Sequence, residues 1–129
     1  MKTVTAALIR REDFYLVTKR AAGQNLEGFW EFPGGKLEQD ETLYECVERE
    51  ILEELGLVVR AADIFCESIH TYEKGQIKLV AIMASIISGT LRLSVHDDFR
   101  WCFPQEILDL KLAPADIPIA QRLRNYHGN

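Results

Sequence analysis

Short apolar runs separated by charged or turn-forming residues dominate this chain, a pattern typical of β-strands. Residues 4–9 and 14–17 are two such runs, and the charged residues 10–13 between them predict a tight turn. The same pattern predicts a longer hairpin and several shorter strands, in residues 68–73 and 76–87 around a turn at Lys74-Gly75, and in residues 28–32, 57–59, 61–68 and 99–103.

Residues 42–55 change to a helical period, with apolar side chains at every fourth position. These are Leu43, Val47, Ile51 and Leu55, which would form one buried stripe. Thr42 followed three residues later by Glu45 fits a capping box at the start of the helix. Gly56 stands where a left-handed residue commonly ends a helix, so both ends are predicted by local signals.

Two further helices are expected near the end of the chain. Pro104 can begin a helix that ends near Leu110, because proline fits the first helical turn. A final helix, opened by Asp116 or by residues 117–118, is expected to run to about Asn125. Strands and helices in mixed order predict an α/β or α+β sandwich.

The length of 129 residues predicts one domain, residues 1–129, with a substantial core. Apolar residues make up 47% and charged residues 27%, which fits an ordinary soluble globular protein. A formal net charge of −5 disfavours binding to duplex nucleic acid, because such binding needs a basic face. The sequence holds no run of about 18 apolar residues, so we expect no membrane span and a cytoplasmic location.

The three cysteines, Cys46, Cys66 and Cys102, lack the spacing of a metal site. They predict reduced and mostly buried thiols, and Cys46 in particular is expected to fill a small space in the core. His70 and His127 are expected to be structural or exposed.

The predicted helix of residues 42–55 carries a crowded acidic face. Glu50, Glu53 and Glu54 stand at positions i, i+3 and i+4, and like charges at this spacing destabilise a helix. Arg49 can reach Glu53, yet one arginine cannot neutralise three carboxylates. Either the face is simply solvated, or it holds a hard cation such as Mg²⁺ or Mn²⁺, which takes oxygen ligands.

The spacing of these residues resembles the Nudix box at every defined position. Nine positions across 23 residues agree: Gly35, Glu41, Arg49, Glu50, Ile51, Glu53, Glu54, Gly56 and Leu57. The resemblance implies the Nudix fold, in which a mixed β-sheet lies between α-helices, and a hydrolase that cleaves phosphoric anhydrides. It favours the cation site over the solvated face.

By position, the resemblance implies a role for each acidic residue. Glu53 and Glu54 would hold Mg²⁺, with Mn²⁺ as the alternative, helped by Glu50 and by the backbone carbonyl of Gly34. Together with Glu53, Glu50 belongs to the implied catalytic set, as the first candidate for the base that activates water, and Glu41 is the second candidate. Arg49 would act there by fixing the rotamers of the carboxylates.

One position departs from the family pattern. MutT-type members of the family usually carry a glutamate six residues before a tryptophan that matches Trp101, and here Val95 stands at that position. Asp97 or Asp98 could supply the missing metal ligand or base, and His96 retains the neighbouring histidine. The alternative is that both aspartates lie in an exposed turn.

Residues outside the box resemble the nucleotide-binding segments of MutT-type pyrophosphohydrolases. Those expected to contact substrate are Arg20 from the basic strand end, Glu31, Phe32, Pro33 and Gly34 from the approach to the box, and Asp116 from the base-contacting segment. Residues 112–118 are most similar to the form seen in CTP pyrophosphohydrolases. The alternative for Asp116 is that it caps the last helix.

The resemblance implies Mg²⁺-dependent hydrolysis of a nucleoside triphosphate to a nucleoside monophosphate and pyrophosphate. The expected substrate is a small nucleotide of the 8-oxo-dGTP type or of the CTP and 5-methyl-dCTP type, so the implied role is sanitisation of the nucleotide pool. One alternative is hydrolysis of another nucleoside diphosphate derivative, such as a nucleotide sugar, ADP-ribose or a dinucleoside polyphosphate. A non-catalytic nucleotide-sensing protein is a further alternative, although such proteins commonly lose the box carboxylates.

Overall fold

A computed structural model of the protein describes residues 1–126, so His127 lies outside the described residues. The elements follow the chain as β1 (Lys2–Arg11), β2 (Phe14–Arg20), β3 (Trp30–Glu31), α1 (Leu43–Leu55), β4 (Leu57–Tyr72), β5 (Gly75–Gly89), β6 (His96–Cys102), α2 (Pro104–Ile107), the 3₁₀-helix η1 (Pro114–Asp116) and α3 (Ile117–Arg124). Among these described residues, no helix has the length and apolar character needed to cross a membrane.

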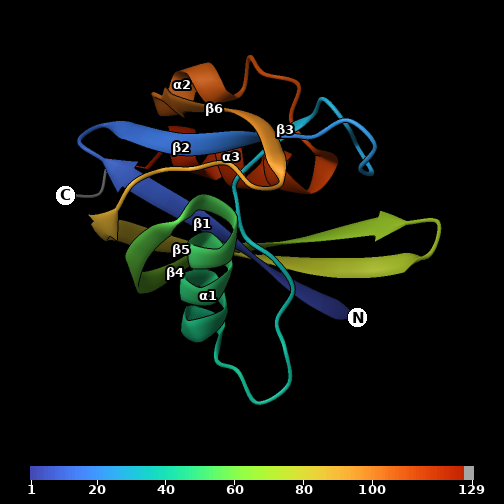
Figure 1. The fold of residues 1–129 in the computed structure, drawn as a ribbon. Helices are drawn as coiled ribbons and strands as arrows, with labels where there is room; N and C mark the ends of the chain where they lie inside the picture. The colour runs from blue at the N-terminus through green and yellow to red at the C-terminus, as the bar shows by residue number, and fades with distance from the viewer. Residues whose placement is uncertain (127–129) are drawn as a thin grey trace.

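Within residues 1–126, six strands form a mixed sheet, and five of them follow the order β3-β2-β1-β5-β4. The sixth, β6, pairs with β2 along the edge opposite to β3. The pairing of β1 with β5 is parallel, and the remaining pairs are antiparallel. Strand β1 pairs with β2 only near their shared turn, at Arg10–Tyr15 and Arg11–Phe14. Beyond that turn the two strands diverge, which opens the middle of the sheet for the loop before α1 (Figure 1).

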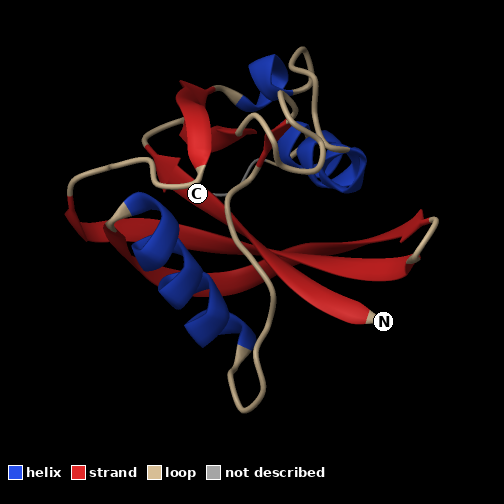
Figure 2. Cartoon of the chain, turned by 45° about the vertical axis from the view of Figure 1, so that its right-hand side comes forward, coloured by secondary structure: helices blue, strands red, loops and turns tan. Residues whose placement is uncertain are grey.

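Helices cover both faces of this sheet, as Figure 2 shows. On one face, α1 buries Val47, Ile51 and Leu55 against apolar residues of β1, β4 and β5. On the other face, α2 and α3 bury Ile107 and Leu123 against β1, β2 and β5. The predicted sandwich of a mixed sheet between helices is therefore confirmed.

Helix α1 agrees closely with its local sequence signals. Thr42 Oγ1 accepts from the Glu45 N–H at 3.1 Å, and Glu45 Oε1 accepts from the Thr42 N–H at 2.8 Å, so the predicted capping box is formed. Gly56 ends the helix at φ 69°, in the left-handed region. The predicted stripe differs only at its first residue, since Leu43 is partly buried, whereas the neighbouring Cys46 is fully buried.

Several predicted boundaries were wrong by a few residues. The long hairpin turns at residues 73–74, because Tyr72 pairs with Gly75, one residue earlier than expected. The two strands predicted in residues 57–68 are one strand, β4, because bulges absorb the breaks in its pattern. Helix α2 ends at Ile107 rather than near Leu110, and the unpredicted η1 precedes α3.

The loop between β3 and α1 runs along the free edge of β1. Ala7 N donates to Pro33 O at 2.7 Å, Thr5 N to Gly35 O at 2.8 Å, and Leu37 N to Thr3 O at 3.1 Å. These bonds hold the segment around Gly34 and Gly35, the glycine loop, in a fixed position between the sheet and α1. The fold thereby brings the glycines next to the acidic face of the helix.

Candidate active site

A cleft of about 340 Å³ opens where this loop, α1 and the start of β6 meet. Its wall includes Gly34, Gly35, Glu54, Glu31, His96 and Asp116. A wider hollow of about 850 Å³ continues beyond Asp116 and is lined in part by Tyr72 and Lys36. Part of the predicted site lines this depression, although its residues come from distant parts of the sequence: Gly34 and Glu54 of the metal set, and Arg20, Glu31, Phe32 and Asp116 of the substrate set. Within residues 1–126, the predicted residues Glu50, Glu53, Asp97 and Pro33 are not among those that line it.

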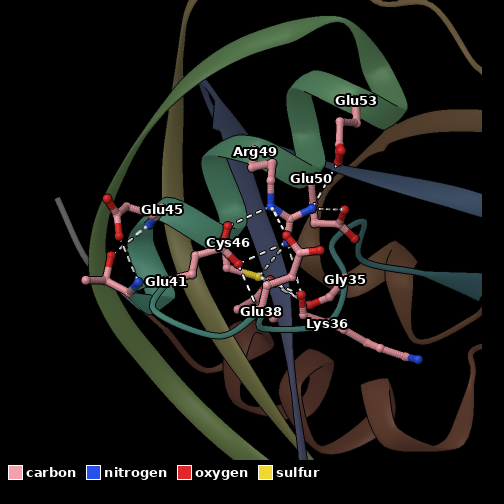
Figure 3. Close-up of polar contacts among 11 residues, drawn as sticks. Gly35, Lys36, Glu38, Glu41, Glu45, Cys46, Arg49, Glu50 and Glu53 are labelled. Carbon is pink, nitrogen blue, oxygen red and sulfur yellow. Dashed lines mark hydrogen bonds and ion pairs between the residues drawn. The ribbon is translucent and has the colours of Figure 1, made fainter.

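Arg49 lies among the carboxylates of the box and binds several of them at once (Figure 3). Its Nε and Nη2 donate to the two oxygens of Glu41 at 2.6 and 3.0 Å. Its Nη1 donates to Glu50 Oε1 at 2.7 Å and to Glu53 Oε1 at 3.0 Å. One planar guanidinium therefore sets the relative positions of three glutamates, as expected for a residue that fixes rotamers.

Gly34 and Gly35, where the loop enters the box, allow close packing against their backbone. A Cβ on Gly34 would lie 2.0 Å from Thr5 O, and a Cβ on Gly35 would lie 1.3 Å from Glu50 Oε2. Neither glycine has a positive φ. These glycines let β1 and the Glu50 side chain lie close against the backbone of the loop. They are not needed here for the sharp backbone turn that a glycine also allows.

Glu54 has one carboxylate oxygen that is removed from water. Its Oε1 is buried and has no hydrogen-bond partner among residues 1–126. Burial, and after it the negative charges of Glu50, Glu31 and Glu53, raises the pKa of Glu54 to about 8. A buried acceptor without a partner, surrounded by negative charge, is the electrostatic signature of a site that suits a cation.

Glu50 and Glu41, the two candidate bases, have opposite electrostatic environments. Burial raises the pKa of Glu50 above its ordinary value, although Arg49 opposes the shift. Hydrogen bonds from Arg49 lower the pKa of Glu41 to about 2. Because both oxygens of Glu41 are bound by Arg49, Glu50 is the better placed of the two to accept a proton.

Asp116 is buried and lines both the cleft and the wider hollow. Its Oδ2 accepts from the Phe32 N–H at 2.8 Å, and its side chain makes no capping hydrogen bond to α3. The structure thus disfavours the alternative that this side chain serves as a helix cap. Burial raises the pKa of Asp116 to about 8, against the opposing effect of the Phe32 N–H.

Glu31 is held between two basic side chains. Arg20 Nη1 donates to Glu31 Oε1 at 3.1 Å, and His96 Nε2 lies 3.1 Å from Glu31 Oε2. The His96 side chain is 3% exposed, and its Nδ1 has no partner among the described residues. No specific role was predicted for His96, and only the pairing of β2 with β6 brings it beside Arg20.

The position of the missing glutamate lies at the edge of the cleft. Val95 lines the cleft, and its carbonyl accepts from Gln24 Nε2 at 3.1 Å. Asp97 Oδ2 accepts from the Ala22 N–H at 3.2 Å, so in this conformation it joins the loop after β2 to β6. Its role as a metal ligand stays a prediction. Within residues 1–126, no three His, Cys, Asp or Glu side chains are already gathered around one ion-sized point.

A comparison with protein families matches residues 4–122 to the NUDIX domain. The chain belongs to the Nudix family. It is 36% identical over 121 residues to a relative named CTP pyrophosphohydrolase from Escherichia coli (strain K12), covering 94% of this chain and 90% of the relative. It is 34% identical over 130 residues to a putative 8-oxo-dGTP diphosphatase 2 from Mycobacterium tuberculosis (strain H37Rv), covering 98% and 91%.

The crystal structure of the MutT protein from Methanosarcina mazei superposes with a TM-score of 0.86 at 26% identity. The match covers 96% of this chain and 93% of that structure. These Nudix relatives confirm the expected fold and the expectation that the chain is a Nudix hydrolase.

Proposed function

We propose that this Nudix hydrolase converts a nucleoside triphosphate to a nucleoside monophosphate and pyrophosphate, with a divalent cation bound at the acidic face of α1. The observation that carries the proposal is the buried, unpartnered Oε1 of Glu54 in the wall of the cleft. A nucleotide brings further negative charge into a cleft that already has an excess of it. A cation is therefore needed for substrate and site to coexist.

The oxygen donors of the site fit Mg²⁺, with Mn²⁺ as the alternative. Glu50, Glu53 and Glu54 would supply carboxylates, and Gly34 would supply a backbone carbonyl. When bound, the cation would neutralise phosphate charge and polarise the phosphorus under attack.

The acidic and basic residues of the site would have separate roles in the reaction. Glu50, whose pKa is raised by burial, would take a proton from the attacking water. Arg49 would keep Glu50 and Glu53 in one arrangement through Nη1, which contacts both. Glu41 would act by holding Arg49 in place rather than as the base.

The part of the cleft around Asp116 would bind a nucleobase whose edge carries hydrogen-bonding groups. At neutral pH the buried Asp116 can be protonated, because its pKa is about 8, so it can donate one hydrogen bond or accept others after ionisation. Phe32 lies in the same wall. The names of the relatives favour CTP and 8-oxo-dGTP as the first nucleotides to test, and the resemblance of residues 112–118 to CTP pyrophosphohydrolases adds 5-methyl-dCTP.

A nucleotide panel with detection of pyrophosphate and monophosphate tests this proposal. We expect turnover of at least one of CTP, 5-methyl-dCTP and 8-oxo-dGTP, with release of pyrophosphate in the presence of Mg²⁺. The panel includes ADP-ribose, a nucleotide sugar and a dinucleoside polyphosphate. Turnover confined to those three compounds would overturn the triphosphate proposal in favour of hydrolysis of another nucleoside diphosphate derivative.

A further inference from the structure

A buried thiol and a buried hydroxyl lie directly beside the glycine loop of the site. Cys46 on α1 and Thr5 on β1 are both almost fully buried, and Cys46 Sγ lies 3.4 Å from Thr5 Oγ1. Cys46 was expected only to fill a small space. In the structure its sulfur is surrounded by polar groups of Gly35, Lys36 and Arg49 (Figure 3).

These two side chains complete the hydrogen bonding of two loop carbonyls. Gly35 O accepts from Thr5 N at 2.8 Å and from Thr5 Oγ1 at 3.1 Å. Lys36 O accepts from Arg49 Nη2 at 3.1 Å and from Cys46 Sγ at 3.3 Å. A carbonyl oxygen has two lone pairs, so these four bonds use both carbonyls fully, and the more distant approach of Cys46 Sγ to Gly35 O, at 3.6 Å, meets an oxygen that already accepts twice. The loop is therefore fixed from both β1 and α1.

The thiol is suited to act as a donor. Burial raises the pKa of Cys46 above its ordinary value, so the sulfur keeps its proton near neutral pH. The Thr5 hydroxyl has a single proton, and its bond to Gly35 O uses that proton. The S–H proton of Cys46 is then available for Lys36 O, which lies 3.3 Å from the sulfur, nearer than Gly35 O at 3.6 Å.

The loop that these donors fix is in contact with the proposed base. Glu50 Oε2 lies against Gly35, where a Cβ would stand 1.3 Å from it. Arg49 contacts Lys36 O through Nη2 and Glu50 Oε1 through Nη1. A shift of the Gly35–Lys36 segment by a few tenths of an ångström would therefore reach both oxygens of Glu50.

We propose that Cys46 is a positioning residue, whose thiol donates to the Lys36 carbonyl and thereby holds the Gly35–Lys36 segment against Glu50 and Arg49. This inference rests on the proposed function for its kinetic readout, because the reaction gives the position of Glu50 its meaning. Cys46 itself would touch neither substrate nor metal.

Two substitutions at Cys46 separate hydrogen bonding from packing. Cys46→Ala and Cys46→Ser both remove the sulfur and leave almost the same space, but only serine keeps a donor. We expect Cys46→Ala to lower kcat for the preferred triphosphate about tenfold with KM within about twofold of wild type. Cys46→Ser is expected to keep kcat within about threefold of wild type. Urea denaturation of both variants checks that they are equally stable.

A second readout needs neither metal nor nucleotide. In the wild type, Arg49 Nε donates to Glu41 Oε2 at 2.6 Å, which predicts a slowly exchanging Nε–H signal in the NMR spectrum of the metal-free protein. We expect this signal in Cys46→Ser and its broadening or loss in Cys46→Ala. Thr5→Val, compared with Thr5→Ser, gives the same comparison from the β1 side if Cys46→Ala fails to fold.

The outcomes are distinguishable. Equal kcat and an equal Arg49 signal in the alanine and serine variants would overturn the positioning role. So would equal losses in both, because packing alone would then explain them. If the wild type turns over no triphosphate, the proposed function fails, while the Arg49 signal still decides whether Cys46 positions the loop.

Discussion

Glu50 fills the space beside Gly35 that any side chain at that position would need, since a Cβ there would lie 1.3 Å from Glu50 Oε2. The other oxygen of Glu50 accepts from Arg49 at 2.7 Å. The carboxylate is therefore confined between a backbone and a guanidinium. Confinement of this kind restricts a proposed base to one geometry before substrate arrives.

Gly35→Ala is expected to damage activity much more than folding. The Glu50 carboxylate is the end of a flexible side chain and can swing away from a new Cβ, so the free energy of unfolding should change little. Displacement of the proposed base by about 1 Å should lower kcat about 100-fold. In a Glu50→Ala background the same glycine substitution should cost almost nothing further, which steady-state kinetics of the double-mutant cycle would show. Fully additive losses would count against the contact.

Arg49→Lys tests whether the planar guanidinium, rather than its charge, organises the site. A lysine keeps the charge but cannot contact Glu41, Glu50 and Glu53 together. We expect kcat to fall about 10- to 100-fold. Arg124→Lys, on the exposed side of α3, is the matched control and should leave kcat unchanged. Wild-type kinetics in Arg49→Lys would show that charge alone is enough.

Metal binding is expected to release a proton from Glu54. Its pKa is about 8 in the metal-free protein, so below pH 8 a cation must displace a proton to use this carboxylate. The apparent affinity for Mg²⁺ or Mn²⁺ should therefore tighten as pH rises toward 8 and level off above it. Calorimetry at pH 7 in two buffers of different ionisation enthalpy measures the proton, and Glu54→Gln should abolish it. Binding without proton release at pH 7 would contradict the assignment.

Asp116 should make the protein less stable as pH rises. Its pKa is 3.8 in an ordinary aspartate and about 8 in the folded protein, so folding favours the protonated form. The resulting stabilisation is fully present below about pH 4 and is lost as pH rises through about 8. Urea denaturation across this range should show that decline in the wild type and a smaller one in Asp116→Asn, whose amide oxygen can still accept from Phe32. Identical pH profiles would mean that Asp116 is ionised throughout.

The parts of this protein that sequence could predict depend on neighbours along the chain. Helix α1 was predicted closely, because Thr42, Glu45 and Gly56 act within one or two turns of it. The acidic face is also local, since Glu50, Glu53 and Glu54 share it by helical spacing alone. Only the burial that distinguishes Glu54 from Glu53 depends on the rest of the fold.

The remaining features of the site depend on contacts between distant segments. Asp116 and Phe32 are separated by 84 positions, and His96 and Glu31 by 65. No periodicity or spacing encodes such pairs, because they arise from how β2, β6 and the last helix assemble. The polar surroundings of Cys46 were missed for the same reason, since they require β1 and the glycine loop to meet α1.

The most direct test of the proposed reaction is the rate of pyrophosphate release from the preferred triphosphate, measured against Mg²⁺ concentration, in Glu53→Gln/Glu54→Gln. The matched control is Glu12→Gln/Asp13→Asn, which also removes two negative charges, but from the exposed turn after β1. We expect the first variant to lose about 100-fold or more in rate and the control to retain wild-type activity. A Glu53→Gln/Glu54→Gln protein with the wild-type rate and unaltered Mg²⁺ dependence would contradict the proposed metal site.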